Sequence, residues 1–244
     1  PTNKGVYQIY AESLGNLSVT EQEALSAPIG KKIAIEYLKT TFDIAFLCLH
    51  GPYGEDGRLQ GLLEYLDIPY TGSGILSSAI GINKRVQKEL MLKAGFESPA
   101  YISIQREDWL KNRDVAGIQS KLAAAIGYPA VVKSPTQGSS IGVSVVQSDD
   151  SEMLESAIDR SFFVRKVKAS VWNTWSQDQQ EDYIRTLCDI REGIGIPVIC
   201  NGTTLYHPHD LWHFVTEFAQ NHPEKELIIE SSDAEAEIII EGFI

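Results

Sequence analysis

A six-residue apolar run at positions 44–49 leads directly into a turn rich in glycine at positions 50–57. A continuous apolar run of this length predicts a strand that is buried on both faces, as in a parallel sheet. Leucines then recur at the spacing of one helical face, at Leu59, Leu62, Leu63 and Leu66. A strand, a turn and a helix in this order form the repeating unit of α/β proteins. We therefore expect an α/β fold with a largely parallel sheet.

The pattern changes after Gly95, which is a typical helix C-cap. Two β-rich runs, at 130–133 and 143–146, are joined by a long polar loop. Such a pair predicts two antiparallel strands, and the apolar run at 237–241 predicts a closing strand. These features are typical of an α+β domain. We place a domain boundary near residue 95.

The net charge of −12 is concentrated in one part of the chain. Residues 1–148 contain 14 acidic and 14 basic side chains, whereas residues 149–244 contain 19 acidic and 7 basic ones. Phosphate backbones require clustered Lys and Arg, so this balance argues against nucleic acid as a partner. The acidic part indicates an added, solvent-facing segment rather than a continuation of one uniform domain.

Two further features limit the class of protein. No run of 18 apolar residues is present, so we expect no helix that crosses a membrane. The three cysteines are scattered without metal-ligand spacing, and idle thiols in a reducing cytoplasm are the simplest interpretation. The chain begins with Pro1 rather than Met, and we expect it to be a fragment.

The turn at 50–57 lies between a strand and a helix, which suggests a phosphate-binding loop. However, Glu55 and Asp56 place negative charge at the helix N-terminus, where a phosphate would bind. Carboxylates at this position more often cap the helix. His50, at the end of the predicted strand, is more often structural than catalytic when judged on spacing alone.

The polar loop at 134–142 is the better candidate for an anion site. Ser139 and Ser140 are two adjacent hydroxyls between glycines, which let backbone N–H groups approach a charged ligand. Lys133 ends an apolar strand, so it must either reach water or meet an anion, and spacing leaves both roles open. Lys84, at the start of a helical run, is unremarkable by itself.

Three histidines, His207, His209 and His213, have a spacing that superficially resembles metal ligands. Pro208 and Asp210 beside them are typical of the first turn of a helix. A helix entry is the favoured interpretation, and metal binding stays the minor alternative. We assign no metal ligand in this chain.

Five blocks taken together resemble the D-alanine–D-alanine ligases of the ATP-grasp superfamily. They follow the order of that family and comprise positions 50–73, 78–84, 131–133, 138–143 and 238–244. The resemblance implies an N-terminal parallel α/β (pre-ATP-grasp) domain at 1–95, followed by an incomplete α+β ATP-grasp domain at 96–244. Residues at about 165–231 then form an acidic insertion where the family has a short connection.

The resemblance implies an ATP-dependent, cytoplasmic carboxylate–amine ligase for peptidoglycan synthesis. It would join two D-alanines through an acyl phosphate, with ATP and Mg²⁺ as cofactors and a homodimer as the expected assembly. Two alternatives stay open. One is a catalytically silent ATP-grasp module that binds nucleotide or a partner, and the other is a related ligase with a different second substrate.

The resemblance also implies roles for single residues. Lys84 and Lys133 would contact the phosphates of ATP. The loop with Ser139 and Ser140 would close over the γ-phosphate, and Ser139 would also lie near the first D-alanine. His50 would lie in the substrate pocket.

At the end of the chain, the resemblance implies an adenine site. Glu241 would accept a hydrogen bond from the adenine amino group, while the backbone of Gly242 and Ile244 would bind the ring edge. The magnesium ligands of the family come later than this hinge, so we expect them outside this chain. A fragment without them is expected to be inactive.

Overall fold

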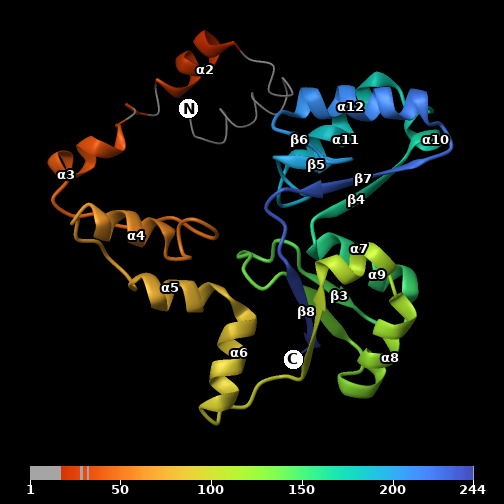
Figure 1. Ribbon diagram of the computed structural model, residues 1–244, viewed down its shortest axis with the longest axis horizontal. Coiled ribbons are helices and arrows are strands. Elements are labelled where there is room, and N and C mark those ends of the chain that lie inside the picture. The colour runs from red at the N-terminus through yellow and green to blue at the C-terminus, as the bar shows by residue number, and fades with distance from the viewer. Residues whose placement is uncertain (1–17, 28–29, 32, 244) are drawn as a thin grey trace. The chain divides into compact units, whose positions relative to one another are not determined.

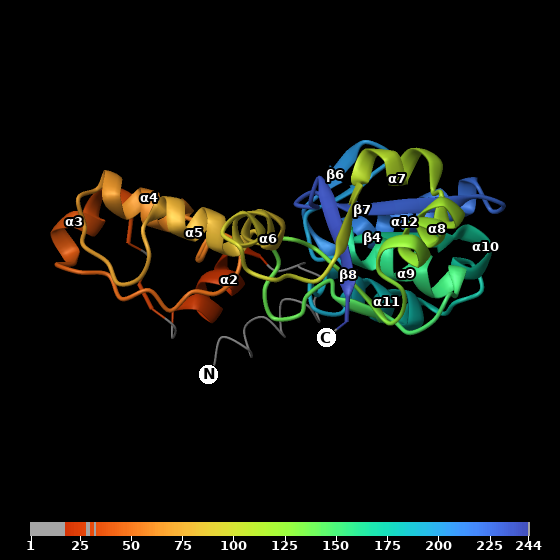
Figure 2. The ribbon, with the colours of Figure 1, turned by 90° about the horizontal axis from the view of Figure 1, so that it is seen from below.

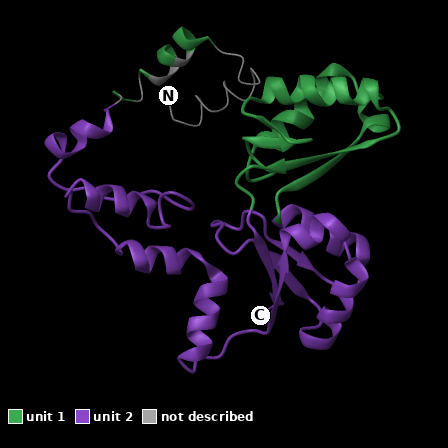
Figure 3. Ribbon diagram, in the orientation of Figure 1, with its two compact units in different colours: residues 1–31, 162–234 green, residues 32–161, 235–244 purple. Residues whose placement is uncertain are grey.

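The computed structural model describes residues 18–27, 30–31 and 33–243. The chain folds into two compact units (Figure 3). Within the described ranges, unit 1 contains helix α2 (Val19–Ser26) and residues 162–234, and unit 2 contains residues 33–161 and 235–243. None of the helices in these ranges is both long and apolar enough to cross a membrane.

The first half of unit 2 is helical. Its elements are η1 (Ile35–Tyr37), α3 (Leu38–Thr41), α4 (Arg58–Tyr65), α5 (Ile75–Ile82) and α6 (Lys84–Lys93) (Figure 1). Helix α4 confirms the predicted amphipathic helix and buries Leu63. Its N-cap is Gly57, whose φ of 91° favours glycine and whose Cβ, if present, would lie 2.8 Å from the carbonyl oxygen of Ile75. A glycine is therefore required where this helix begins.

The buried strand expected at positions 44–49 is not formed. Only Ala45 is paired, in a parallel bridge with Tyr70. Phe46 and Leu49 are 77% and 58% exposed. An apolar strand becomes buried only when other strands and helices cover it, and beyond that bridge no strand among the described residues pairs with this run. The direction of the bridge is parallel as expected, but the prediction of a buried strand is wrong.

The second half of unit 2 is a four-stranded antiparallel sheet with helices on one face. Its elements are β1 (Tyr101–Gln105), α7 (Arg106–Asn112), α8 (Val115–Ala125), β2 (Ala130–Lys133), β3 (Ser144–Val146), α9 (Ser151–Ser161) and β8 (Glu237–Gly242). The strand order is β1-β8-β2-β3, which confirms the predicted antiparallel pair and the closing strand. Helices α8 and α9 lie side by side against the sheet (Figure 2). The core between them contains Leu122, Val132, Leu154, Ile158 and Ile240.

Residues 162–234 form a second antiparallel sheet with a core of its own. Its elements are β4 (Val164–Lys168), α10 (Ala169–Trp172), α11 (Gln177–Cys188), β5 (Val198–Cys200), β6 (Thr203–Leu205), α12 (Pro208–Asn221) and β7 (Glu226–Ser231). The strand order is β4-β7-β5-β6. The fully buried side chains include Trp172, Ile184, Leu211 and Ile229.

This second sheet covers the range, at about 165–231, in which an acidic insertion is expected, and its being inserted relative to the family stays a prediction. The segment 162–234 holds 11 acidic and 6 basic side chains. Its first and last strands, β4 and β7, are paired from Val164 opposite Glu230 to Lys168 opposite Glu226. The two ends of the segment 162–234 therefore lie side by side.

The mixed α/β class expected from the sequence is confirmed by these elements. The domain boundary expected near residue 95 lies between α6 and β1, inside unit 2, and stays a prediction.

Candidate functional site

Glu241 of β8 lies between two lysines of unit 2. Its carboxylate forms an ion pair with Lys133 of the neighbouring strand β2, and its Oε2 lies 2.7 Å from Lys88 Nζ of α6. The three side chains are only 11–17% exposed. Burial alone would raise the pKa of Glu241, but the hydrogen bonds and charges of Lys133 and Lys88 outweigh burial and hold this pKa below its usual range. The carboxylate is therefore charged and shared by two cations.

A second set of ion pairs lies beside the first. Arg85 of α6 contacts Glu237 at the start of β8, and its Nη1 lies 2.5 Å from Glu89 Oε1. Positions four apart share one face of a helix, so Lys84 and Lys88 lie on this side of α6 together. Three of the four apolar residues of the same helix stay 46% exposed, namely Leu90, Met91 and Leu92. Charge pairs rather than apolar contacts thus attach α6 to the sheet.

Lys84 contacts the polar loop. Its Nζ donates hydrogen bonds to the carbonyl oxygens of Gln137 at 2.5 Å and Pro135 at 3.2 Å, and its backbone N–H donates to the Pro135 oxygen at 2.9 Å. Burial lowers the pKa of Lys84, and the positive charge of Lys133 lowers it further. Both predicted phosphate-binding lysines therefore belong to one electrostatic cluster at the base of the loop.

The tip of the loop has an unusual backbone. Ser139 and Ser140 are exposed and have φ values of 51° and 61°. Non-glycine residues rarely adopt this left-handed conformation, which is found preferentially at ligand-binding segments. The turn is closed by a 3.0 Å hydrogen bond from the Ile141 N–H to the Gly138 oxygen. The two predicted loop hydroxyls thus lie at its surface, next to the lysine cluster.

His50 lies at the surface of unit 2. Its side chain is 86% exposed, and its Nδ1 lies 3.9 Å from Glu55 Oε1. Glu55 accepts a 2.5 Å hydrogen bond from the Gly51 N–H, and Asp56 accepts from two neighbouring backbone N–H groups. Only the Arg58 N–H, bound by Asp56, belongs to α4; Glu55 binds the turn that precedes the helix, and the N-cap Gly57 has no side-chain cap. A Cβ on Gly138 would lie 3.9 Å from the Gly51 Cα, so the turn and the polar loop approach each other.

Two residues of this cluster were not predicted from the sequence. Lys88 holds Glu241 and also donates a 2.9 Å hydrogen bond to Ser98 Oγ. Glu235 accepts hydrogen bonds from the hydroxyls of Thr136 and Ser134, and burial raises its pKa. The position of Lys88, one helical turn after Lys84, was the available signal for the first. No local pattern marks Glu235, because its partners lie about 100 residues earlier in the chain.

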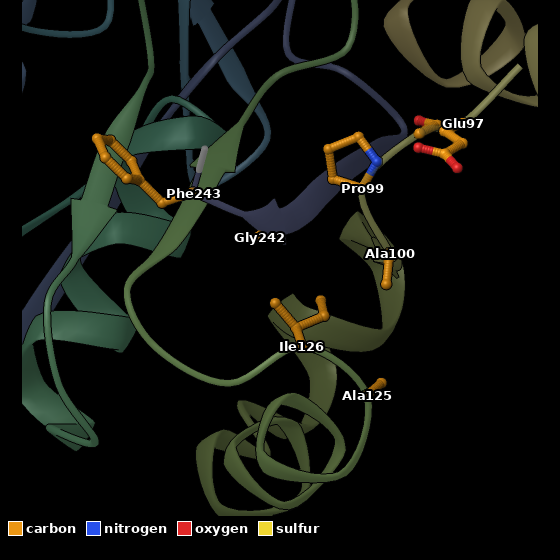
Figure 4. A pocket seen from close by; sticks show the side chains of 8 residues that line it. Glu97, Pro99, Ala100, Ala125, Ile126, Gly242 and Phe243 are labelled. Carbon is orange, nitrogen blue, oxygen red and sulfur yellow. The ribbon is translucent and has the colours of Figure 1, made fainter.

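The end of β8 borders a shallow pocket of 410 Å³ (Figure 4). Gly242 and Phe243 line it together with Pro99, Ala100 and Ile126. The Gly242 N–H already donates a 3.3 Å hydrogen bond to the Ala100 oxygen. A planar ring bound here would therefore use other backbone groups of the hinge. Ile244, the other predicted hinge residue, lies outside the described residues.

Sequence models of known families match two parts of the chain. The model for the D-ala D-ala ligase N-terminus matches residues 5–73, and the model for the D-ala D-ala ligase C-terminus matches residues 90–168. Together these matches cover more than half of the chain, and both describe one kind of ligase. The chain therefore belongs to the D-alanine–D-alanine ligase family.

Individual relatives agree with this assignment. The D-alanine–D-alanine ligase of Pelotomaculum thermopropionicum is 39% identical over 134 residues, which are 55% of this chain and 42% of the relative. That of Bacillus cytotoxicus is 42% identical over 146 residues, 59% of this chain and 38% of the relative. The crystal structure of the VanG D-Ala:D-Ser ligase from Enterococcus faecalis is similar at 32% identity and a TM-score of 0.42, over 49% of this chain and 33% of that one. The matches span about two fifths of the length of the curated relatives.

Proposed function

We propose that the protein acts as an ATP-dependent ligase that joins two D-alanines through an acyl-phosphate intermediate in peptidoglycan synthesis in the cytoplasm. The observation that supports this most directly is the charge cluster between α6 and the β1-β8-β2-β3 sheet. There, Lys133 and Lys84 lie beside the anionic Glu241, at the base of the loop that ends in Ser139 and Ser140. Membership of the ligase family supports ATP as the ligand that we propose for this cluster.

The residues present fit a nucleotide. Lys84 and Lys133 supply two cations for phosphate oxygens, and Glu241 supplies a charged acceptor for the adenine amino group. Glu241 is held by Lys88 independently of Lys133, so Lys133 can turn to a phosphate while the carboxylate keeps one partner. ATP would supply the phosphoryl group that activates a carboxylate. The lysines would neutralise the charge that develops around it.

The loop around Ser139 would protect the reaction from water. Lys84 donates to carbonyl oxygens in the first half of this loop, so a phosphate that attracts Lys84 also draws the loop toward itself. A closed loop keeps water from hydrolysing an acyl phosphate. Ser139 would also lie near the first D-alanine. His50 would contribute to the substrate pocket from the neighbouring turn.

The loop gives the most direct test of this proposal. Without nucleotide, the amides of residues 136–141 are expected to exchange rapidly with solvent, because an exposed polar loop has few apolar contacts to fix it. Saturating ATP and Mg²⁺ should slow their exchange in the whole protein, as followed by hydrogen–deuterium exchange mass spectrometry. The helix α9 should serve as the unaffected reference. Equal exchange with and without ATP would contradict the proposed role of the loop.

We further infer that the 244-residue chain alone has no ligase activity. Within the ranges that the structure describes, no three His, Cys, Asp or Glu side chains are grouped so that they could hold a metal ion. Magnesium-assisted phosphoryl transfer requires oxygen ligands that hold the ion between two phosphates. The expected result is no phosphate release above background with ATP, Mg²⁺ and D-alanine. Turnover at a few per cent of the rate of a complete ligase would place the metal site inside this chain.

Self-association is part of the proposal. The 44–49 run exposes apolar side chains, and only Ala45 of this run is paired, in a bridge with Tyr70. A strand of another chain can pair with this segment and cover its apolar side chains. A homodimer is the assembly that we propose.

A further inference from the structure

Two histidines of unit 1 converge on the surface of helix α12. The Nε2 atoms of His209 and His213 are 3.1 Å apart, and the two ring centroids are 4.3 Å apart at 79°. The residues are one helical turn apart, so both project from the same face. His209 is 40% exposed in its side chain, and His213 is exposed. Nothing in the ligase reaction uses this pair.

The separation of the two nitrogens suits a metal ion. Imidazole nitrogen is a preferred ligand of Zn²⁺, Cu²⁺ and Ni²⁺. Two nitrogens that each lie about 2.0–2.1 Å from an ion and 3.1 Å from each other subtend about 100° at that ion. This value lies between the octahedral and tetrahedral angles, so the spacing of the two nitrogens fits two adjacent coordination positions of such an ion.

We propose that His209 and His213 form a two-histidine site for a divalent transition-metal ion. Water fills the remaining coordination positions, because the described part of the chain offers no group of three or more metal-binding side chains. The two imidazoles are poor ligands for Mg²⁺, because this ion prefers oxygen donors. The site therefore differs in its ligand chemistry from the magnesium site of the proposed ligase reaction.

The surroundings favour a cation at this place. Asp210 Oδ1 lies 4.0 Å from His209 Nδ1, on the ring nitrogen that would not bind the ion. A carboxylate near that second nitrogen orients a metal-bound imidazole and increases its basicity. The segment 162–234 also carries 11 acidic against 6 basic side chains, which raises the local concentration of cations. His207, the third histidine of the sequence pattern, is the N-cap residue of α12 and is not needed for the pair.

The test is a calorimetric titration of the chelator-treated 244-residue chain with NiCl₂ or ZnCl₂ near pH 7.5. We expect one saturable ion per chain. His209→Gln and His213→Gln should each weaken binding by about tenfold or more, because either change removes the chelate advantage. His222→Gln is the matched control, since His222 is an exposed histidine at the other end of the same helix, and it should bind as the wild type does.

Tryptophan fluorescence gives a second measurement of binding that is independent of calorimetry. The Trp212 ring lies 4.8 Å from the His213 ring, so Cu²⁺ at the site should quench tryptophan fluorescence, and Trp212→Phe should remove most of the quenched signal. A large excess of Mg²⁺ should leave the quenching unchanged. Three outcomes would overturn the proposal: no saturable binding, equal loss in all three histidine variants, or competition by Mg²⁺. Circular dichroism of each variant verifies that α12 is intact.

Discussion

Replacing Trp172 with alanine is expected to destabilise unit 1 by about 3–5 kcal/mol, the usual result when a large aromatic side chain is removed from a core. The Trp172 side chain is fully buried, and its indole N–H donates a 3.3 Å hydrogen bond to Thr216 Oγ1 of α12. It also packs edge-on against Tyr183 of α11, with ring centroids 6.1 Å apart. Its loss therefore leaves a cavity where three helices meet. Urea denaturation followed by far-ultraviolet circular dichroism measures the change.

Trp175 gives the matched control. Its ring lies 5.7 Å from that of Trp172, but its side chain is partly exposed. Trp175→Ala should cost no more than about 1–2 kcal/mol, because much of its apolar surface already contacts water. Equal midpoints for the two variants would show that unit 1 does not have the core described above.

Replacing Lys133 with alanine is expected to weaken ATP binding by the whole protein by about 1.5–3 kcal/mol, which corresponds to about 10- to 150-fold in affinity. The physical reason is the loss of one charge-assisted hydrogen bond to a phosphate in a site that largely excludes water. The fold should survive, because Glu241 keeps its 2.7 Å ion pair with Lys88. Calorimetry with ATP measures the affinity, and thermal denaturation verifies the fold.

Two further variants show whether this effect is specific to the charge at position 133. Lys121→Ala removes an exposed lysine of α8 and should leave the affinity for ATP unchanged. Lys133→Arg keeps the charge and should restore part of the affinity, since an arginine also binds phosphate. An alanine variant at position 133 that binds ATP as tightly as the wild type would remove Lys133 from the nucleotide site.

The sequence predicted features that depend on neighbours along the chain. Helix α4 follows from its leucine spacing, and the β2–loop–β3 segment follows from two apolar runs around a polar loop. The buried strand at 44–49 failed because burial depends on what covers the strand, which the run itself does not encode. Lys88 and Glu235 escaped detection for the same reason. Their partners are set by the tertiary fold, as with Lys133 and Glu241, which are 108 positions apart in sequence.

The segment 162–234 shows the same division. Its acidic character was detected in the sequence, because 19 of the 33 acidic residues lie after position 148. Its fold was not, because β5 and β6 are only three residues long, too short for a reliable alternating pattern. The pairing of β4 with β7 is likewise invisible along the sequence, since residues 169–225 separate the two strands.

The central place of β8 has a consequence for how the protein folds. β8 lies between β1 and β2 in the sheet, yet the whole segment 162–234 precedes it in the chain. The strands β1 and β2 therefore have no hydrogen-bonded connection until a strand from far along the sequence enters between them. Pairings between such distant segments form slowly, because closing the long loop has to precede the contacts that stabilise it. The segment 162–234 shortens this search, since the pairing of β4 with β7 brings the chain just before β8 close to the chain just after α9. We expect the segment 162–234 to fold first and to guide β8 into its sheet.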